Sequence, residues 1–142
     1  MASAGSDAGG DNSGVVQFGL TRGLVVEELG WDDDVDEALR EAIMEVIDGD
    51  LVEESDEAVD VVLQWWRSDD GDVVDCLVDA LTDLSDAGCV WLLTPKFGLP
   101  GHVSQADVAE GAVTAGLSLT STALVSQDWL AHKLVRPKGH RR

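Results

Sequence analysis

The sequence is poor in basic residues: nine Lys and Arg stand against 28 Asp and Glu, and the formal net charge is −19. Nucleic acids and anionic membranes would repel a surface of this charge. The chain also lacks a long apolar run, because its longest uncharged stretch, Gly111–Gln127, is rich in Ser, Thr and Gly. We therefore expect no membrane span and no direct contact between the acidic surface and nucleic acid.

Cysteine is scarce as well, since Cys76 and Cys89 are the only two in the chain and both lie in apolar patterns. This excludes the disulfide framework of small secreted domains, and the N-terminus does not resemble a signal peptide. We predict a reduced, cytoplasmic protein in which both thiols are buried as small hydrophobic side chains. A redox pair is the alternative, because the sequence does not determine the distance between the two residues.

Motifs for metal binding, nucleotide binding and catalysis are also missing. His102, His132 and His140 do not have the spacing of zinc ligands with either cysteine. The acidic loop Asp48–Val59 departs from the calcium-hand pattern at the positions of the essential Gly and the bidentate Glu. Gly30 is followed by an indole and three carboxylates, which would repel a phosphate group. We predict no metal, no cofactor and no catalytic residue, and the abundant carboxylates define no specific acid–base pair.

Apolar segments alternate with amphipathic helical patterns along the chain, which is typical of a parallel sheet covered by helices. The length of 142 residues fits one domain. We predict a disordered arm over 1–14, a single α/β domain over 15–136 and a basic tail over 137–142. The strand candidates are Leu24–Leu29, Val59–Trp66, Cys89–Thr94, Leu117–Val125 and Leu130–Val135, and the helical patterns cover 32–47, 72–86 and 104–116.

The predicted fold is a three-layer Rossmann-like sandwich with a mostly parallel central sheet and a C-terminal antiparallel strand pair. Val59–Trp66 and Cys89–Thr94 are apolar on both faces, so we expect them to be parallel neighbours at the sheet centre. Asp32, Asp33 and Asp34 are expected to cap the first helix, and Gly88 to end the second. Ser104 is the expected N-cap of the third helix, and the acidic connector 51–56 could include a short edge strand at 51–52.

Residues that could contact a ligand follow the predicted strands, and ligands of parallel sheets collect beyond the carboxyl ends of the strands. Arg67 and Lys96 follow consecutive strands, so we expect them to hold one anion or acidic peptide between indole walls. The alternative is that the tryptophans are core residues and the two cations pair with nearby carboxylates. The candidate ligand-binding residues are Trp31, Trp66, Arg67, Lys96, Asp128 and Trp129.

Most of the acidic residues lie between residues 27 and 86, where Arg40 and Arg67 are the only basic residues. Residues 129–142 reverse the charge, with several Lys and Arg and no acid. We interpret the acidic helical surface as a binding face for a basic protein partner; a solvated surface without a partner is the alternative. The candidate partner-binding residues are Glu37, Glu41, Glu45, Asp75, Asp79 and Asp83.

Three segments carry a resemblance to a known family: Trp31-Asp32-Asp33-Asp34-Val35-Asp36, Val90-Trp91-Leu92-Leu93-Thr94-Pro95-Lys96, and Asp128-Trp129 through Leu134-Val135. From about Phe18 to Lys138 the chain resembles an actinobacterial family catalogued as domain of unknown function 3052. The resemblance implies a shortened, degenerate relative of the methyltransferase-type Rossmann fold. It implies no established activity or catalytic residue, and the glycine-rich cofactor turn of active methyltransferases is replaced here by Gly30-Trp31-Asp32.

Two functions are compatible with these patterns. The first is a non-enzymatic cytoplasmic binding or regulatory module that presents an acidic helical surface to a protein partner. The second is a small-molecule-binding or degenerate methyltransferase-like enzyme domain, which would use a crevice near Trp66, Arg67 and Lys96. A flat acidic face favours the first function, and a deep pocket at the strand ends favours the second.

Overall fold

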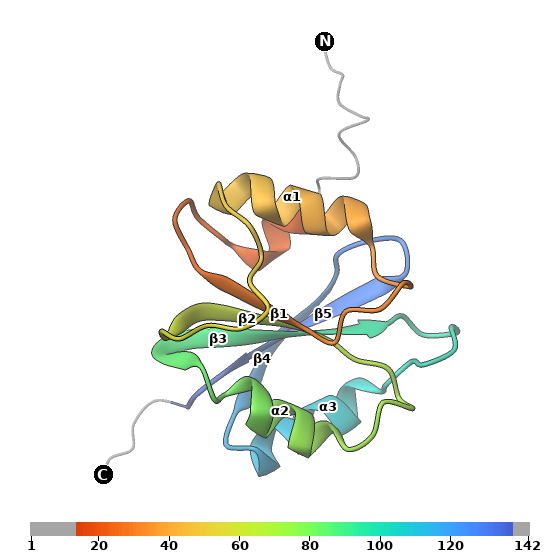
Figure 1. The fold of residues 1–142 in the computed structure, drawn as a ribbon. Helices are drawn as coiled ribbons and strands as arrows, with labels where there is room; N and C mark the ends of the chain where they lie inside the picture. The colour runs from red at the N-terminus through yellow and green to blue at the C-terminus, as the bar shows by residue number, and fades with distance from the viewer. Residues whose placement is uncertain (1–13, 138–142) are drawn as a thin grey trace.

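Helices cover both faces of a single five-stranded sheet in the computed structural model of the protein, which describes residues 14–137 (Figure 1). Helix α1 covers one face, and α2 and α3 cover the other. Nearly all of the predicted arm (1–14) and tail (137–142) lies outside the described residues. In chain order the elements are β1 (Val26–Leu29), α1 (Glu37–Ile47), β2 (Val59–Trp65), α2 (Val73–Ala80), β3 (Leu84–Pro95), α3 (Gln105–Thr114), β4 (Ser118–Leu124) and β5 (Trp129–Val135).

The sheet is mixed, with the strand order β1-β2-β3-β5-β4. Strands β2 and β3 are parallel neighbours as predicted, and β4 and β5 form the predicted antiparallel pair. The prediction of a mostly parallel sheet was wrong, because β5 inserts between β3 and β4 and is antiparallel to both. The physical reason is polarity: β5 buries Ala131 and Leu134 completely, whereas β4 is rich in Ser and Thr and takes the edge.

The core consists of two apolar layers, one on each face of the sheet. On the α1 face, Leu63, Trp65 and Trp91 of the central strands pack against the buried side of the helix. On the other face, Val62 and Leu92 pack against α2 and α3. Because successive strand side chains point to opposite faces, the continuous apolar sequences of β2 and β3 serve both layers.

Helix α1 begins at Glu37, later than its predicted start at Asp32. The N-cap is Asp36, whose carboxylate accepts a hydrogen bond of 2.9 Å from the backbone N–H of Leu39. The expected capping by Asp32, Asp33 and Asp34 was therefore wrong. Asp34 instead accepts hydrogen bonds from Arg67, in the loop after β2.

Helix α2 ends at Ala80, short of its predicted range, and β3 begins already at Leu84. Arg136 donates a hydrogen bond of 2.6 Å to the carbonyl oxygen of Ser85, which anchors this early part of β3 beside the end of β5. Gly88 does not end the helix as predicted but lies within β3, where a Cβ would come within 2.7 Å of a backbone oxygen of β2. The early strand was missed because this polar stretch has no apolar alternation.

The third helix and its cap agree with the sequence prediction. The hydroxyl of Ser104 accepts a hydrogen bond of 3.1 Å from the backbone N–H of Asp107. The possible edge strand at 51–52 is present as an isolated parallel bridge between Val52 and Glu27. This bridge covers the outer edge of β1, so a short acidic connector continues the sheet beyond its first strand.

A buried histidine joins three strands on the α2–α3 face. The ring of His132 in β5 lies with Nε2 3.0 Å from the Thr94 hydroxyl of β3 and Nδ1 2.9 Å from the Thr122 hydroxyl of β4. Burial lowers the pKa of His132 to about 4, so the ring is neutral near pH 7. Both ring nitrogens are used in these contacts, and His132 is a structural cross-link between strands.

Helices α2 and α3 pack closely at Gly111, where a Cβ would lie 2.7 Å from Cγ1 of Val73. We predict that Gly111→Ala lowers the free energy of unfolding by about 1 kcal/mol, because overpacking outweighs the gain in helix propensity. Urea denaturation would measure the change. The penalty should disappear when Val73→Ala is already present, and an equal penalty in both backgrounds would contradict the packing explanation.

Candidate functional site

Arg67 ties two loops together at the carboxyl edge of the parallel strands. Its guanidinium donates hydrogen bonds to the carbonyl oxygen of Gly30, at 2.8 Å, and to the carboxylates of Asp34 and Asp70. It also lies 5.4 Å from the ring centre of Trp129. The hydrogen bond from Arg67 lowers the pKa of Asp34, which keeps this carboxylate ionised. We call Arg67 with Gly30, Asp34 and Asp70 the Arg67 clamp.

The other candidate ligand residues also lie near this edge, but several of them serve in packing. Trp66 and Trp129 are only 7% and 4% exposed, so both belong to the core. Trp31 is half-exposed, and its indole N–H donates to a carboxylate of α1. The backbone N–H of Lys96 donates a 2.8 Å hydrogen bond to the carbonyl oxygen of Asp128, which joins the loops that follow β3 and β4.

The geometry does not favour the expected anion site between Arg67 and Lys96. The guanidinium of Arg67 is already occupied by the clamp, as the alternative interpretation of the sequence required. Lys96 makes no salt bridge with any residue in the described part of the chain. An anion would have to displace Asp34 and Asp70 from Arg67, which costs the clamp its charge-assisted hydrogen bonds.

Beside the clamp lies a shallow hollow of about 320 Å³, at the small end of the range for ligand pockets. A Cβ at Gly30 would lie 2.3 Å from the backbone oxygen of Trp65, so the loop after β1 rests directly on the end of β2. Gly30 has a φ of 77°, which a side chain would strain. The other lining residues are Trp31, Asp32, Gln64, Trp65, Trp66, Arg67 and Asp70. A second and larger hollow of about 610 Å³ shares Gly30 and Trp31 with it and is also lined by Glu28, Leu29, Arg40 and Glu53.

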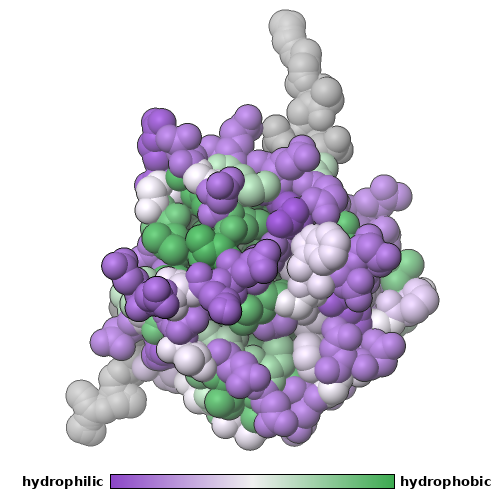
Figure 2. Space-filling model, viewed as in Figure 1, coloured by the Kyte–Doolittle hydropathy of each residue, from purple (hydrophilic) through white to green (hydrophobic). Residues whose placement is uncertain are grey.

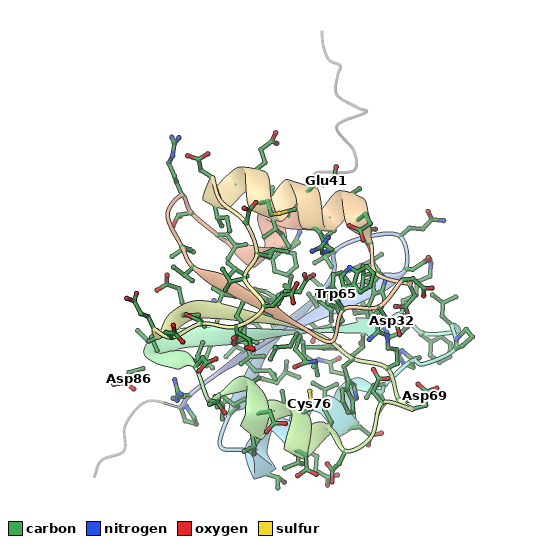
Figure 3. The ribbon with its side chains drawn as sticks, viewed as in Figure 1. Asp32, Glu41, Trp65, Asp69, Cys76 and Asp86 are labelled. Atoms are coloured by element: carbon green, nitrogen blue, oxygen red, sulfur yellow. The ribbon has the colours of Figure 1, made fainter. Side chains whose placement is uncertain are left out.

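A buried ion pair behind this edge was not predicted from the sequence. Arg40 of α1 makes two hydrogen bonds to the carboxylate of Glu28, at 2.7 and 2.8 Å, and Glu28 also accepts a 2.8 Å bond from the indole N–H of Trp65. The hydrogen bond with Glu28 raises the pKa of Arg40. Figure 3 shows Trp65 between α1 and the sheet. Glu28 stands out in the sequence as a charged residue in a strand candidate that is otherwise mostly apolar. The sequence did not indicate that Arg40 is its partner.

A second buried carboxyl group, Glu27, lies on the opposite face of β1 and is 3% exposed. Burial raises its pKa to about 7, and a hydrogen bond with Asp83 together with the charges of Asp83 and Glu54 acts in the same direction. Asp83 was predicted to lie on the exposed face of the second helix. It follows α2 instead, where its carboxyl group contacts Glu27.

The six acidic residues predicted as one binding face belong to opposite layers of the molecule. Glu41 and Glu45 lie on α1, and Asp75 and Asp79 lie on α2, with the sheet between them (Figure 1). Glu41 points outward from α1 in Figure 3. Glu37 is partly neutralised by Arg40, at 2.7 Å. A single flat partner could contact only one of these layers at a time, so the predicted face must be divided.

The structure also describes the remaining features considered in the sequence. Cys76 and Cys89 are free and partly buried, and burial raises the pKa of both thiols, to about 12 for Cys76. Among residues 14–137, no group of three or more His, Cys, Asp or Glu is arranged to hold a metal ion. None of the described helices has the length and apolar character needed to cross a membrane.

Several solved structures to which this chain is similar are methyltransferases. The mitomycin 7-O-methyltransferase MmcR superposes with a TM-score of 0.61 at 12% identity, over 92% of this chain and 54% of MmcR. The CcbJ methyltransferase of Streptomyces caelestis gives 0.58 at 12% identity, over 97% of this chain and 93% of CcbJ. The chain thus spans about half the length of MmcR. At these identities the likeness defines the fold alone: a methyltransferase-type Rossmann α/β domain.

The family model described as "Protein of unknown function (DUF3052)" matches residues 15–138, and the chain belongs to this family. Uncharacterized proteins of Mycobacterium tuberculosis and Mycobacterium bovis are each 48% identical to it over 124 residues. The match covers 87% of this chain and 78% of each relative. The resemblance drawn from the sequence is therefore confirmed.

Replacing Arg40 should reveal the cost of leaving Glu28 unpaired. We predict that Arg40→Met lowers the free energy of unfolding by about 3 kcal/mol, because the buried carboxylate loses its counter-charge. The double variant Glu28→Gln with Arg40→Met should recover part of this loss. Arg22→Met is the control, since it breaks only the exposed pair with Asp48 and should change stability by less than about 1 kcal/mol. Similar losses for Arg40→Met and Arg22→Met would contradict this assignment.

Glu27 should make stability depend on pH in a defined direction. Between its usual pKa of 4.5 and the folded-state value of about 7, the folded protein keeps a proton that the unfolded chain has released. Raising the pH through this interval therefore favours unfolding, and stability should fall. Denaturation at several pH values would measure this slope for the protein and for Glu27→Gln. The variant should lose most of the slope and be the more stable form at pH 8; an unchanged slope would assign the dependence to other carboxyl groups.

Proposed function

We propose that the protein is a non-enzymatic binding or regulatory module whose α2–α3 layer docks a basic protein partner. The observation that carries the proposal is the charge of this layer. Neither helix contains a Lys or Arg, and Lys96 is the only one between residues 68 and 132. Carboxylates without neighbouring cations project a negative potential that attracts a basic surface and accelerates its association.

The two helical layers differ in how far their charge is neutralised. On the α1 side, Glu37 pairs with Arg40, and Asp48 pairs with Arg22. On the α2–α3 side, the exposed carboxylates make no salt bridge with any described residue; they are Asp72, Asp75, Asp79, Asp107 and Glu110. Of the two acidic layers, the α2–α3 layer is therefore the better match for a basic partner.

The alternative function, a small-molecule-binding or methyltransferase-like enzyme domain, has less support. The Arg67 clamp and the close approach of Gly30 to β2 occupy the part of the edge between the ends of β1 and β2. Two hollows remain beside Gly30, and the arginine that lines each of them, Arg67 or Arg40, is already paired with a carboxylate. We accordingly assign no cofactor and no catalytic residue to the proposed module.

A cytoplasmic location is part of the proposal. Cys76 and Cys89 are free thiols, as expected of a protein in a reducing compartment. The raised pKa of each thiol disfavours the reactive thiolate, so a redox role is the less favoured alternative.

The test is capture of partners from a lysate by the protein and by two charge variants. Asp75→Asn with Asp79→Asn removes two negative charges from the α2–α3 layer, and Glu41→Gln with Glu45→Gln removes two from α1 as the matched control. We expect a basic protein that binds the parent chain and the α1 control but binds the α2–α3 variant at least about tenfold more weakly. Its association rate should fall as salt rises, because exposed charges are screened over about 8 Å at physiological ionic strength.

Two results would contradict the proposal. One is an affinity that stays unchanged between about 50 and 500 mM salt, since the Debye length shortens severalfold over this range. The other is a partner lost only by the α1 control variant. Circular dichroism of each variant establishes that the fold is retained, which is expected because all substituted side chains are exposed.

A further inference from the structure

We infer that the groove between α2 and α3 receives the apolar face of a basic amphipathic helix from the partner, an inference that rests on the proposed function. The groove has a volume of about 520 Å³ and lies between the first turn of α2 and the length of α3, from its N-cap Ser104 to Thr114. It is separate from the Arg67 clamp and from the hollow beside Gly30, apart from Trp66, which borders both spaces.

The floor of the groove is apolar and its rim is acidic. Trp66, Val73, Val74 and Val103 form the apolar lining. The acidic lining residues are Asp72, Asp107 and Glu110. Gly111 brings the helices together beneath the groove, because its missing side chain allows Val73 to approach. The floor is thus held by close packing, and only the rim offers charge.

Apolar surface continues outside the groove along both helices. Val78, one turn beyond Val74 on α2, is 51% exposed, and Val113 on α3 is 71% exposed. Hydrophobic surface is visible between hydrophilic residues over α2 in Figure 2. In a chain with a net charge of −19, these valines add apolar contact area beside carboxylates. Apolar surface bordered by polar residues is characteristic of interaction sites.

The apolar floor and the acidic rim of the groove together determine which kind of segment can bind. A partner helix with apolar residues at three- and four-residue spacing can place them on the valines and Trp66. Lys or Arg on the flanks of that helix would then face Asp107 and Glu110 across the rim. A purely polar basic segment would meet the charges but leave the apolar floor uncovered, so the groove discriminates between these two kinds of basic segment.

Two peptides of about 14 residues, roughly four helical turns, separate these possibilities. One is an amphipathic helix of Leu and Lys, and the other has each Leu replaced by Ser. Titrated into 15N-labelled protein, the Leu/Lys peptide should shift the backbone amide resonances of Gly71, Val74, Gly111 and Thr114. Calorimetry should show that it binds at least about tenfold more tightly than the Ser/Lys peptide, because burial of one Leu contributes that much or more.

A variant that fills the groove provides the control. Thr114 is exposed and lines the groove, so Thr114→Trp should keep the fold while reducing binding of the Leu/Lys peptide to the level of the Ser/Lys peptide. Glu41→Trp on α1 should leave both affinities unchanged. Equal affinities for the two peptides on the α2–α3 layer would overturn the groove and leave the proposed function standing. Resonance shifts confined to α1, or no binding at low salt, would overturn both.

Discussion

The carboxyl edge of the sheet depends on the hydrogen bonds that the guanidinium of Arg67 donates. Its four hydrogen bonds reach two loops that leave neighbouring strands, and the group lies 5.4 Å from the ring centre of Trp129. Asp34 lies between Gly30, which rests on the end of β2, and helix α1, which begins at Glu37. These contacts occupy part of the edge that a Rossmann-type domain usually offers to a ligand.

The same ion pairs also affect the charge of the surface. With Arg40 and Arg67 committed to internal partners, the cations nearest the acidic part of the chain are withdrawn from the surface. The exposed carboxylates of α2 and α3 make no salt bridge with any described residue, and the groove between these helices is the larger of the two spaces that Trp66 borders. The protein thus has the architecture of the methyltransferase fold, and the exposed carboxylates without a described salt bridge lie on its α2–α3 layer.

Local sequence patterns were sufficient to predict those helices and strands whose positions depend on their own residues. The apolar sequences of β2 and β3 predicted the centre of the sheet, and Ser104 predicted the start of α3. Features that depend on distant residues were not predictable. The partner of Asp34 is 33 positions away, and Glu28 meets Arg40 only because α1 packs over β1. The position of β5 was likewise not predictable from β5 alone, because it lies inside the sheet only since it is more apolar than β4.

The inserted position of β5 has a consequence for how the chain folds during synthesis. β3 pairs with β2 on one side and with β5 on the other, and β4 pairs only with β5 among the described strands. A ribosome-bound chain that ends before Trp129 therefore leaves one edge of β3 open and gives β4 no neighbour in the sheet. Folding of the second half of the sheet must wait until the last strand leaves the exit tunnel. Truncation within 129–135 would shorten the strand that lies between β3 and β4, and so would weaken the pairing of both.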